Sequence, residues 1–302
     1  MSISDVKFSI VIPSYNRPAR LEKCLTSISN LSYPKNLFEV IVVDDGSDVP
    51  IDSVAEQFKY SVDLSLLRQS NAGPASARNT GAKAAKGHYL VFTDDDCEPE
   101  PSWLGEIEAA FDKIPDALVG GYSINALSDN AYSTASQLLI DYLYSYFNQS
   151  KSQSMFFTSN NFSMPRKLFE EIGGFDTNFP LAAGEDREFC DRWTHHELPV
   201  YYAPSMRVIH AHNLTMRSFW RQHFNYGRGA YCFHKIRSHR QNESLKVEPV
   251  NFYIQLIAYP FLKYRALFSL RISMLFFISQ VANVCGFFWE RSQNKLTSMQ
   301  MH

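Results

Sequence analysis

Four short apolar runs alternate with segments of helical spacing in the first hundred residues, and this alternation constrains the fold more than any other feature. The runs cover residues 8–12, 38–43, 62–67 and 88–93. Helical patterns between and after them cover residues 18–28, 74–86 and 102–111. Apolar runs of this length suit strands buried on both faces. The alternation predicts an α/β fold: a Rossmann-like, mostly parallel central sheet flanked by helices.

Polar motifs follow three of these runs directly. They are Pro13-Ser14-Tyr15, Asp44-Asp45-Gly46-Ser47 and Asp94-Asp95-Asp96. In open α/β sheets, ligands bind beyond the carboxyl ends of the strands. We therefore expect the three motifs to meet at one edge of the sheet and to form a binding site there.

The acidic triplet at residues 94–96 is the strongest chemical signal in the chain. Crowded carboxylates repel each other unless a positive charge neutralises them. A hard divalent cation, Mn²⁺ or Mg²⁺, does this with oxygen ligands, and a diphosphate supplies further ligands. The alternative is a polar turn after a strand; the second acidic strand end at Asp44 and Asp45 favours the cation site.

Three further positions suit the same chemistry. Arg78 lies on a helix that begins near Pro74, where its planar guanidinium suits a phosphate, although a solvated surface arginine is the alternative. His210 follows an apolar strand and can ligate the cation, although a structural histidine is the alternative. Asp186, or else Glu185, suits a general base that takes a proton from an acceptor hydroxyl. Acidic residues at a helix start are also favoured by the helix dipole alone.

Composition excludes several classes of protein. The 302 residues are 45% hydrophobic and 20% charged, as in an ordinary globular protein, and the net charge of −2 does not favour nucleic acid. The five cysteines form no CxxC pair, which predicts no disulfide framework and a reducing compartment. The first residues lack the pattern of a secretory signal, so we expect a cytoplasmic protein.

Six motifs in this order resemble glycosyltransferase family 2, a family of inverting enzymes with the GT-A fold. They are SIVIPSYNR at 9–17, EVIVVDDGS at 39–47, GPASARN at 73–79, FTDDD at 92–96, GGFD at 173–176 and GED at 184–186. The resemblance covers roughly residues 7–215. It implies a catalytic domain at 1–215, with a nucleotide-sugar half at about 7–115 and an acceptor half at about 116–215. Residues 216–302 form a basic, then apolar, helical C-terminal region.

The resemblance also implies roles for single residues. The nucleotide-sugar would be bound by Pro13, Ser14, Tyr15, Arg17, Asp44, Asp45, Arg78, Asp94 and Asp95. The DxD element maps to Asp94 and Asp96, with Asp96 preferred on the metal and Asp94 nearer the ribose. Together with His210, which its place after an apolar strand suggests, Asp96 and Asp94 make up the expected metal ligands. Asn160, Asn161, Gly174 and Phe175 would border the sugar and acceptor. Asp186 would be the catalytic base, with Glu185 as the alternative.

The expected reaction is a metal-assisted single displacement with inversion, serving polysaccharide, glycolipid or other glycoconjugate synthesis. One sugar moves from a UDP-, GDP- or dTDP-sugar to a hydroxyl of a carbohydrate or lipid-linked acceptor. The chain has no QxxRW motif, which processive members carry, so we expect one sugar per event. A nucleotidyltransferase is the alternative, but it would usually have a Gly-rich phosphate loop after the first strand. A non-catalytic nucleotide-sugar-binding module is the second alternative.

The C-terminal region suggests a membrane. Residues 272–289 form an uncharged run of borderline length for a spanning helix. Three interpretations stay open: a spanning helix, an interfacial helix, or helices packed on the catalytic domain. The upstream basic residues favour an anionic membrane surface. They are Arg217, Arg221, Arg228, Lys235, Arg237 and Arg240. We expect peripheral attachment to the cytoplasmic face.

Overall fold

The computed structural model describes residues 6–147, 156–179, 183–241 and 248–300, arranged in two compact units that interleave along the chain. The first unit comprises Met1–Ile124, Ser154–Thr177 and Phe189–Ala211. The second comprises Asn125–Gln153, Asn178–Glu188 and His212–His302. The domain limits at residues 115 and 215 stay a prediction.

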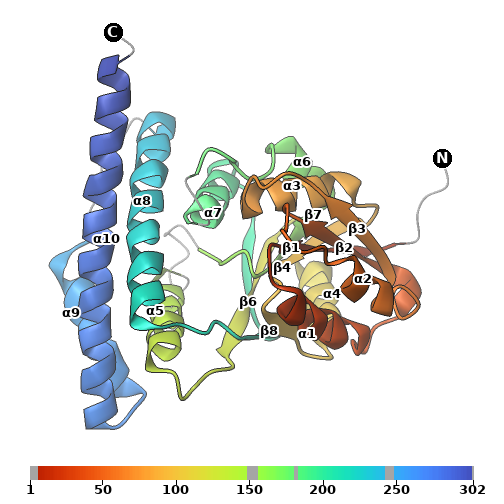
Figure 1. The fold of residues 1–302 in the computed structure, drawn as a ribbon, viewed down its shortest axis with the longest axis horizontal. Coiled ribbons are helices and arrows are strands. Elements are labelled where there is room, and N and C mark those ends of the chain that lie inside the picture. Colours follow the sequence, from red (N-terminus) through yellow and green to blue (C-terminus); the bar gives the residue numbers. More distant parts are fainter. Residues whose placement is uncertain (1–5, 148–155, 180–182, 242–247, 301–302) are drawn as a thin grey trace. The chain divides into compact units, whose positions relative to one another are not determined.

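The first unit contains a sheet whose first half is parallel, as predicted. Its strands are β1 (Phe8–Ser14), β2 (Phe38–Asp44), β3 (Asp63–Arg68) and β4 (Tyr89–Thr93), in the spatial order β3-β2-β1-β4. The pairs β1/β2, β2/β3 and β1/β4 are all parallel (Figure 1). Every residue of β1 and β2 is buried, because helices cover both faces of this half.

The second half of the sheet pairs differently. It adds β5 (Cys97–Pro99), β6 (Leu118–Asn125), β7 (Asn161–Pro165) and β8 (Val200–His210), in the order β7-β6-β8-β5 after β4. The pairs β4/β7, β6/β7 and β5/β8 are antiparallel, so the eight-stranded sheet is mixed. Strand β7 was not predicted from the sequence, because the segment 158–161 before and within it is polar.

Helices pack on the two faces of β1 and β2 according to the alternation of side chains. Phe8, Ile10 and Ile12 join one core cluster with residues of α1 (Pro18–Ser29) and α4 (Trp103–Lys113). Val11 and Val43 meet α3 (Pro74–Ala84) on the other face. There a Cβ atom added to Gly81 would lie 2.4 Å from Val11 Cγ1, so glycine permits this close approach. Short helices η1 (Lys35–Leu37), α2 (Asp52–Phe58) and α6 (Arg166–Glu171) complete the connections.

The second unit is helical. It contains α5 (Ala131–Phe147), α8 (Met216–Gln241), α9 (Val250–Ala258), η2 (Tyr259–Leu262) and α10 (Ala266–Gln300); α7 (Glu185–His195) begins in it and ends in the first unit. One core cluster joins α5, α9 and α10 with Leu214 and Phe219. This is the predicted C-terminal apolar helical extension. Within the described residues, one stretch, Ala266–Asn294, is long and apolar enough to cross a membrane by length and composition.

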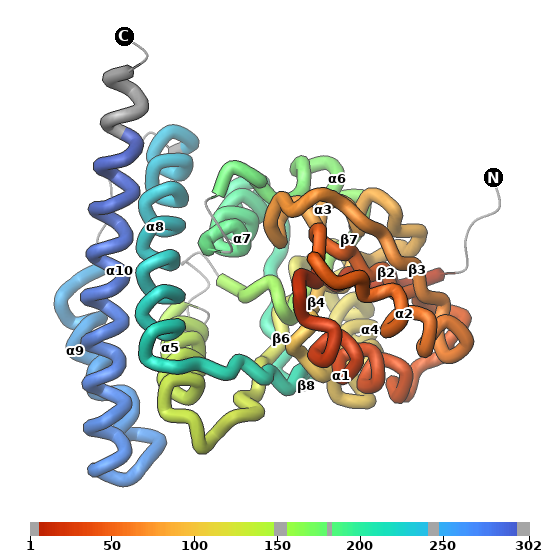
Figure 2. Tube along the Cα trace, in the orientation of Figure 1, coloured from red at the N-terminus to blue at the C-terminus, as the bar shows by residue number. Residues whose placement is uncertain are grey.

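Helices α8 and α10 lie side by side (Figure 2) and touch through glycines. A Cβ atom added to Gly227 would lie 1.8 Å from the carbonyl oxygen of Asn283, and one added to Gly286 would lie 1.8 Å from that of Phe224. Both distances are far below van der Waals contact, so the two backbones approach as closely as they do only because these positions lack side chains.

We expect Gly227→Ala to destabilise the protein by about 1–3 kcal/mol, because the added methyl group forces the two helices apart. Gly105→Ala is the matched control, since Gly105 also lies within a helix but a Cβ atom there meets nothing within 4 Å. This control should raise stability by up to about 1 kcal/mol through helix propensity. Thermal unfolding of the full chain measures both, and equal effects of the two changes would contradict the close packing.

Candidate functional site

The strand-end motifs meet at one edge of the sheet, as expected. Ser14 and Asp44 are partners at the carboxyl ends of β1 and β2, and the Asp45 amide donates to the Ser14 carbonyl at 2.9 Å. The Ser14 hydroxyl in turn donates to Asp95 Oδ2 at 2.8 Å, which joins the end of β1 to the acidic triplet after β4. The parallel order β2-β1-β4 produces this convergence.

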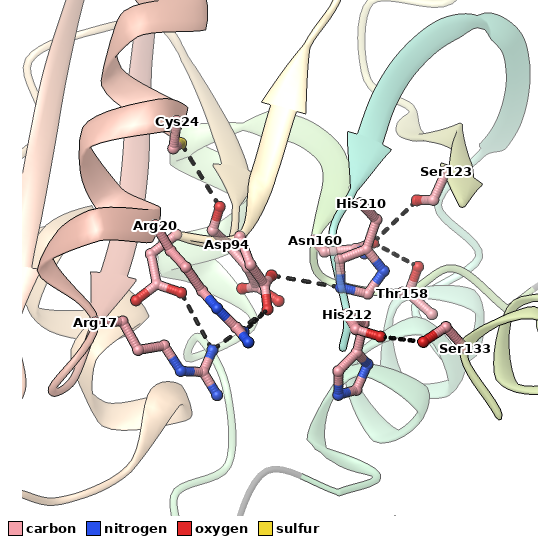
Figure 3. A network of polar contacts seen from close by, with 12 residues as sticks. Arg17, Arg20, Cys24, Asp94, Ser123, Ser133, Thr158, Asn160, His210 and His212 are labelled. Carbon is pink, nitrogen blue, oxygen red and sulfur yellow. Dashed lines mark hydrogen bonds and ion pairs between the residues drawn. The ribbon is translucent and has the colours of Figure 1, made fainter. Parts of the chain in front are cut away.

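Each carboxylate of the triplet contacts an arginine. Arg78 reaches Asp94 at 2.6 Å from α3. Arg17 lies 3.2 Å from Asp95 and 3.4 Å from Asp96. Arg20, on the first turn of α1, reaches Asp96 at 2.9 Å. Figure 3 shows Arg17 and Arg20 converging on the triplet from the same helix start. Guanidinium groups thus balance the negative charge that the sequence places at this edge.

Asp95 is the most deeply buried member of the triplet, at 2% exposure. Burial raises the pKa of Asp95 to about 6; the charges of Asp96 and Asp94 add to this, while Arg17 and the Ser14 hydroxyl oppose it. Its two oxygens are held by Ser14 and Arg17. Asp95 therefore fastens β1 and the start of α1 to the end of β4.

Asp96 and His210 form the pair best suited to a cation. The register of β5 on β8 sets His210 opposite Cys97, and His210 Nε2 lies 3.4 Å from Asp96 Oδ1. Donor atoms of Asp96, Cys97 and His210 lie within 4.8 Å of one another. Burial raises the pKa of the Cys97 thiol well above its usual value, which disfavours the thiolate, and sulfur is a soft ligand that does not suit Mn²⁺ or Mg²⁺. A carboxylate and an imidazole remain, and the carboxylate suits Mn²⁺ or Mg²⁺ as part of a ligand set.

The acidic triplet favours the protonated form of His210. Burial works against its protonation, but the hydrogen bond to Asp96 and the charges of Asp96 and Asp94 outweigh burial and raise the pKa of His210. A metal ion would replace this proton, because a metal ligates neutral imidazole. His212, two residues on, belongs to the second unit, where its carbonyl accepts from the Ser133 hydroxyl at 2.5 Å.

Asp44 is held by Arg68, at the carboxyl end of β3. Arg68 donates through Nε at 2.9 Å and Nη2 at 2.7 Å to one carboxylate oxygen, and the Ser47 amide donates to the other at 2.9 Å. Burial tends to raise the pKa of Asp44, but these bonds from Ser47 and Arg68 outweigh it and lower the pKa. Asp44 is therefore a fully buried anion with a partly exposed arginine above it.

Asp45 holds the loop that leads into α3. It accepts from Gln69 Nε2 at 2.7 Å and from the amides of Ala72 and Gly73 at 2.9 Å each. Gly73 has φ of 87°, a conformation that favours glycine, and it directly precedes α3. These contacts fix the N-terminal end of α3 at the sheet edge. Contact of Asp44 or Asp45 with a base or ribose stays a prediction.

Arg78 is buried although it is charged. It is 3% exposed, pairs with Asp94 and lies over the Phe175 ring at 5.7 Å. Phe175 is itself buried, in an aromatic cluster with Phe92, Phe162 and Phe169. A buried, oriented guanidinium loses little freedom when an anion arrives, which suits a phosphate-binding role.

The Gly174–Phe175 turn is braced from two sides. Asn79 of α3 donates to the Phe175 carbonyl at 2.8 Å and accepts from the Phe175 amide at 2.9 Å. Arg192 donates to the carbonyls of Ile172 and, at 2.6 Å, of Gly174. Gly174 has φ of 68° and no room for a side chain, since its Cβ would lie 2.7 Å from Asn79 Oδ1. These contacts give the turn a structural function; its role beside the acceptor stays a prediction.

The two asparagines at 160 and 161 differ. Asn161 is fully buried: its carbonyl oxygen accepts from Trp103 Nε1 at 2.9 Å, and its amide donates to the carbonyls of Tyr122 and Met206. Asn161 thus ties α4 to the antiparallel half of the sheet. Asn160 accepts from the Thr158 hydroxyl at 2.8 Å and the Ser123 hydroxyl at 3.3 Å (Figure 3). Contact of either asparagine with the sugar or the acceptor substrate stays a prediction.

Glu185 and Asp186 open α7 within the second unit. Glu185 is 4% exposed, whereas Asp186 is half-buried and its Oδ1 accepts from the Arg187 amide at 2.7 Å. The chain before them touches α8, since a Cβ atom added to Gly229 would lie 2.0 Å from the Ala183 carbonyl oxygen. Glu188 forms an ion pair with Arg240, and Arg187 lies over the Phe233 ring at 4.6 Å. Helix α8 therefore fixes the start of α7.

Three residues of the sheet edge were not found from the sequence: Arg20, Arg68 and Gln69. Arg68 and Gln69 follow the third apolar run, so the strand-end rule that selected the other motifs would have found them. Arg20 had no such signal, because its contact with Asp96 spans 76 residues. Of the remaining predicted residues, Pro13 is buried within β1, and Tyr15 is 44% exposed beside it.

Sequence comparison relates this chain to known proteins. The family model described as "Glycosyl transferase family 2" matches residues 9–173. The glycosyltransferase AglE of Haloferax volcanii is 29% identical over 193 residues, which cover 62% of this chain and 60% of AglE. The hyaluronan synthase of Pasteurella multocida is 27% identical over 222 residues, covering 61% of this chain and 22% of the synthase. This chain therefore spans less than two thirds of either relative.

Structure comparison supports the same fold. The mannosyltransferase PcManGT of Pyrobaculum calidifontis, solved with GDP-Man and Mn²⁺, aligns with a TM-score of 0.60 at 17% identity, covering 97% of this chain and 80% of PcManGT.

Proposed function

The chain belongs to glycosyl transferase family 2, and we propose that it moves one sugar from a nucleotide-sugar donor to an acceptor hydroxyl with inversion. The observation that supports this most is the arrangement at the sheet edge. Asp96 lies beside His210, which suits a metal ion, and Asp94 of the same triplet pairs with the buried Arg78. A cation site beside an oriented guanidinium suits a diphosphate leaving group. The acceptor is a carbohydrate or a lipid-linked hydroxyl.

We assign the donor to the carboxyl ends of β1, β2 and β4. The exposed ring of Tyr15 offers a face for the base, while Pro13, Asp44 and Asp45 shape the surface beneath it. Ser14 and Asp95 hold the strand ends together, and Asp94 lies toward the ribose. Arg17 and Arg78 bind the diphosphate oxygens. Hydrogen bonds to the diphosphate then replace some of their contacts with the acidic triplet.

Asp96 and His210 would hold a divalent cation, with Asp94 as a further carboxylate. Mn²⁺ is present in the structure of PcManGT, and Mg²⁺ fits the same oxygen-rich chemistry. When bound, the cation supplies positive charge that stabilises the leaving nucleoside diphosphate.

Asp186 acts as the general base and takes the proton from the acceptor hydroxyl, whose oxygen then attacks the anomeric carbon opposite the leaving group. The bond from that carbon to the diphosphate oxygen breaks as the new glycosidic bond forms, which inverts the configuration. No residue of the chain forms a covalent intermediate. Glu185 is the alternative base.

The protein attaches peripherally to the cytoplasmic face of a membrane through its C-terminal region. The basic residues of α8 contribute less to this than their number suggests, because Arg228 pairs with Glu290 and Arg240 with Glu188. Arg217, Arg221 and Lys235 are exposed.

A screen of donors tests this function. We expect one of the UDP-, GDP- or dTDP-sugars to raise the unfolding temperature of the full chain, and to do so more strongly with Mn²⁺ or Mg²⁺ present. A ligand at about 100 times its Kd stabilises by about 2.7 kcal/mol, which a thermal shift detects easily. EDTA should remove the gain.

The products separate the alternatives. Release of nucleoside diphosphate supports sugar transfer, whereas release of pyrophosphate from a nucleoside triphosphate and a sugar phosphate would identify a nucleotidyltransferase. Binding of a donor without hydrolysis or transfer to any acceptor would identify a non-catalytic module.

A further inference from the structure

Seven large apolar side chains form an exposed stripe along α10, which we call the α10 stripe. It consists of Leu267, Leu270, Met274, Phe277, Val281, Val284 and Phe288, each at least 38% exposed. Successive members are alternately three and four residues apart, so they lie on one face of the helix. At about 1.5 Å per residue the stripe is about 32 Å long. An apolar strip of this length on a protein surface marks an interaction site.

The opposite face of α10 is fixed within the second unit. Ile272, Phe276 and Ala282 are fully buried there, and the Ser273 hydroxyl donates to the Ile257 carbonyl at 2.7 Å. Gly286 touches the backbone of α8. The helix therefore cannot turn over to hide the stripe.

The exposed charged side chains that residues 263–291 contribute around the α10 stripe are positive, although Asp141 of α5 lies near enough to Tyr264 to add to the rise in its pKa that burial causes. The sequence contains no Asp or Glu from residue 249 to 289. Lys263, Arg265 and Arg271 are exposed at one end of the stripe and Arg291 at the other. Glu290 is buried in its pair with Arg228 at 2.8 Å. The complementary partner is an apolar layer with an anionic border, which is the interfacial region of a bilayer that contains anionic lipids.

A second copy of the chain fits this surface less well. The spacing of three and four is that of a coiled coil, but coiled coils select their partner through opposite charges beside the seam. The positions beside the α10 stripe are Arg271, Ser273, Ile278, Gln280, Cys285 and Phe287. They include one cation, Arg271, and no carboxylate, so no opposite charges beside the seam would hold two copies together.

A spanning orientation fits less well too. Helix α8 packs along α10 through Gly227 and Gly286, so α10 could enter the hydrocarbon only with α8 or after separating from it. Helix α8 carries six Arg or Lys residues, and the Arg228–Glu290 pair joins the two helices. Charges at the bilayer centre are costly.

We propose that α10 lies in the plane of an anionic bilayer, with the α10 stripe in the acyl boundary and Arg271 and Arg291 on lipid phosphates. This deepens the proposed membrane attachment by naming its surface, its lipid class and its orientation. The contact would hold the enzyme beside a lipid-linked acceptor without a spanning segment.

Flotation of the full chain with vesicles tests the contact. We expect binding to phosphatidylcholine mixed with phosphatidylglycerol and weak binding to phosphatidylcholine alone. Met274→Ser and Phe277→Ser should each lower affinity by about tenfold or more, since each removes an apolar side chain from the membrane. Arg271→Gln and Arg291→Gln should each lower it by about fivefold on anionic vesicles only. Val49→Ser and Tyr60→Ser, at exposed apolar positions of the first unit, are the matched controls and should not change it.

Spin labels measure the orientation. We would replace Cys232 and Cys285 with Ser and introduce single cysteines at Leu267, Phe277 and Phe288, leaving the three buried cysteines in place. An in-plane helix gives similar shallow depths at all three labels. A deep label at 277 with 267 and 288 in opposite aqueous compartments would show a spanning helix and overturn the proposal.

Two other results would also overturn it. One is the absence of flotation with anionic vesicles. The other is a dimer in solution that dissociates on the Phe277→Ser substitution, which would assign the α10 stripe to a second copy. Donor binding by the same variants, measured as a thermal shift, keeps the questions separate. Lost flotation with retained donor binding refutes the surface alone, whereas lost donor response in the unsubstituted chain refutes the proposed function alone.

Discussion

Replacement of Asp186 by Asn is expected to abolish sugar transfer while the protein still binds its nucleotide-sugar donor. An amide cannot take a proton from an acceptor hydroxyl, and general-base catalysis contributes about 10²- to 10⁴-fold to the rate. The change should leave the fold intact, because an Asn oxygen can still accept from the Arg187 amide as Asp186 Oδ1 does at 2.7 Å. The loss should therefore appear in turnover and not in stability.

The measurement is release of nucleoside diphosphate in the presence of acceptor, alongside the thermal shift with donor and cation. Glu185→Gln is the matched comparison from the neighbouring position. If Glu185→Gln loses transfer while Asp186→Asn keeps it, the base is Glu185. Full activity in both variants would refute a carboxylate base at the start of α7.

Replacement of Asp96 by Asn is expected to lower the affinity for Mn²⁺ by at least about 100-fold. Loss of a residue that only supports a metal ligand already lowers affinity by about 10- to 100-fold, and loss of a ligand should cost at least as much. An amide is a poorer ligand because it lacks the charge that neutralises the cation. The variant should fold, since an Asn oxygen can still accept from Arg20, which reaches Asp96 at 2.9 Å. Transfer should fall together with metal affinity.

Titration of Mn²⁺ followed by electron paramagnetic resonance measures this affinity directly, without any substrate. His210→Gln should also weaken binding, because it removes the imidazole that lies beside Asp96. Asp116→Asn changes an exposed acid away from the sheet edge and serves as the control. Unchanged Mn²⁺ affinity in both Asp96→Asn and His210→Gln would remove the cation from this site.

Most of what could be predicted came from the polar motifs that directly follow the apolar strands. The family, the α/β fold and the apolar helical C-terminal region are confirmed, and so is the meeting of three motifs at one edge of the sheet. The sequence pattern missed β5, β6 and β7. It also gave no sign that Asn16, just before α1, has φ of 55° and bonds Asp48 in the next loop through its side chain.

The partners of the acidic triplet could not be predicted, because they come from distant parts of the chain. Arg20 meets Asp96 across 76 residues, and Asn79 meets Phe175 across 96. Likewise, an apolar helix such as α10 does not reveal in its sequence which face is covered. The α10 stripe appeared only once the packing of Phe276 and Gly286 was known.

The sequence by itself determined that acidic and polar groups gather beyond the ends of β1, β2 and β4, because parallel strands joined by right-handed crossovers must end at the same edge. Tertiary structure alone decided which side chains meet there. His210 lies opposite Cys97 and beside Asp96 because β5 pairs with β8, and that register depends on contacts between segments more than 100 residues apart. Local sequence fixes where a strand ends, whereas long-range pairing fixes what lies across from it.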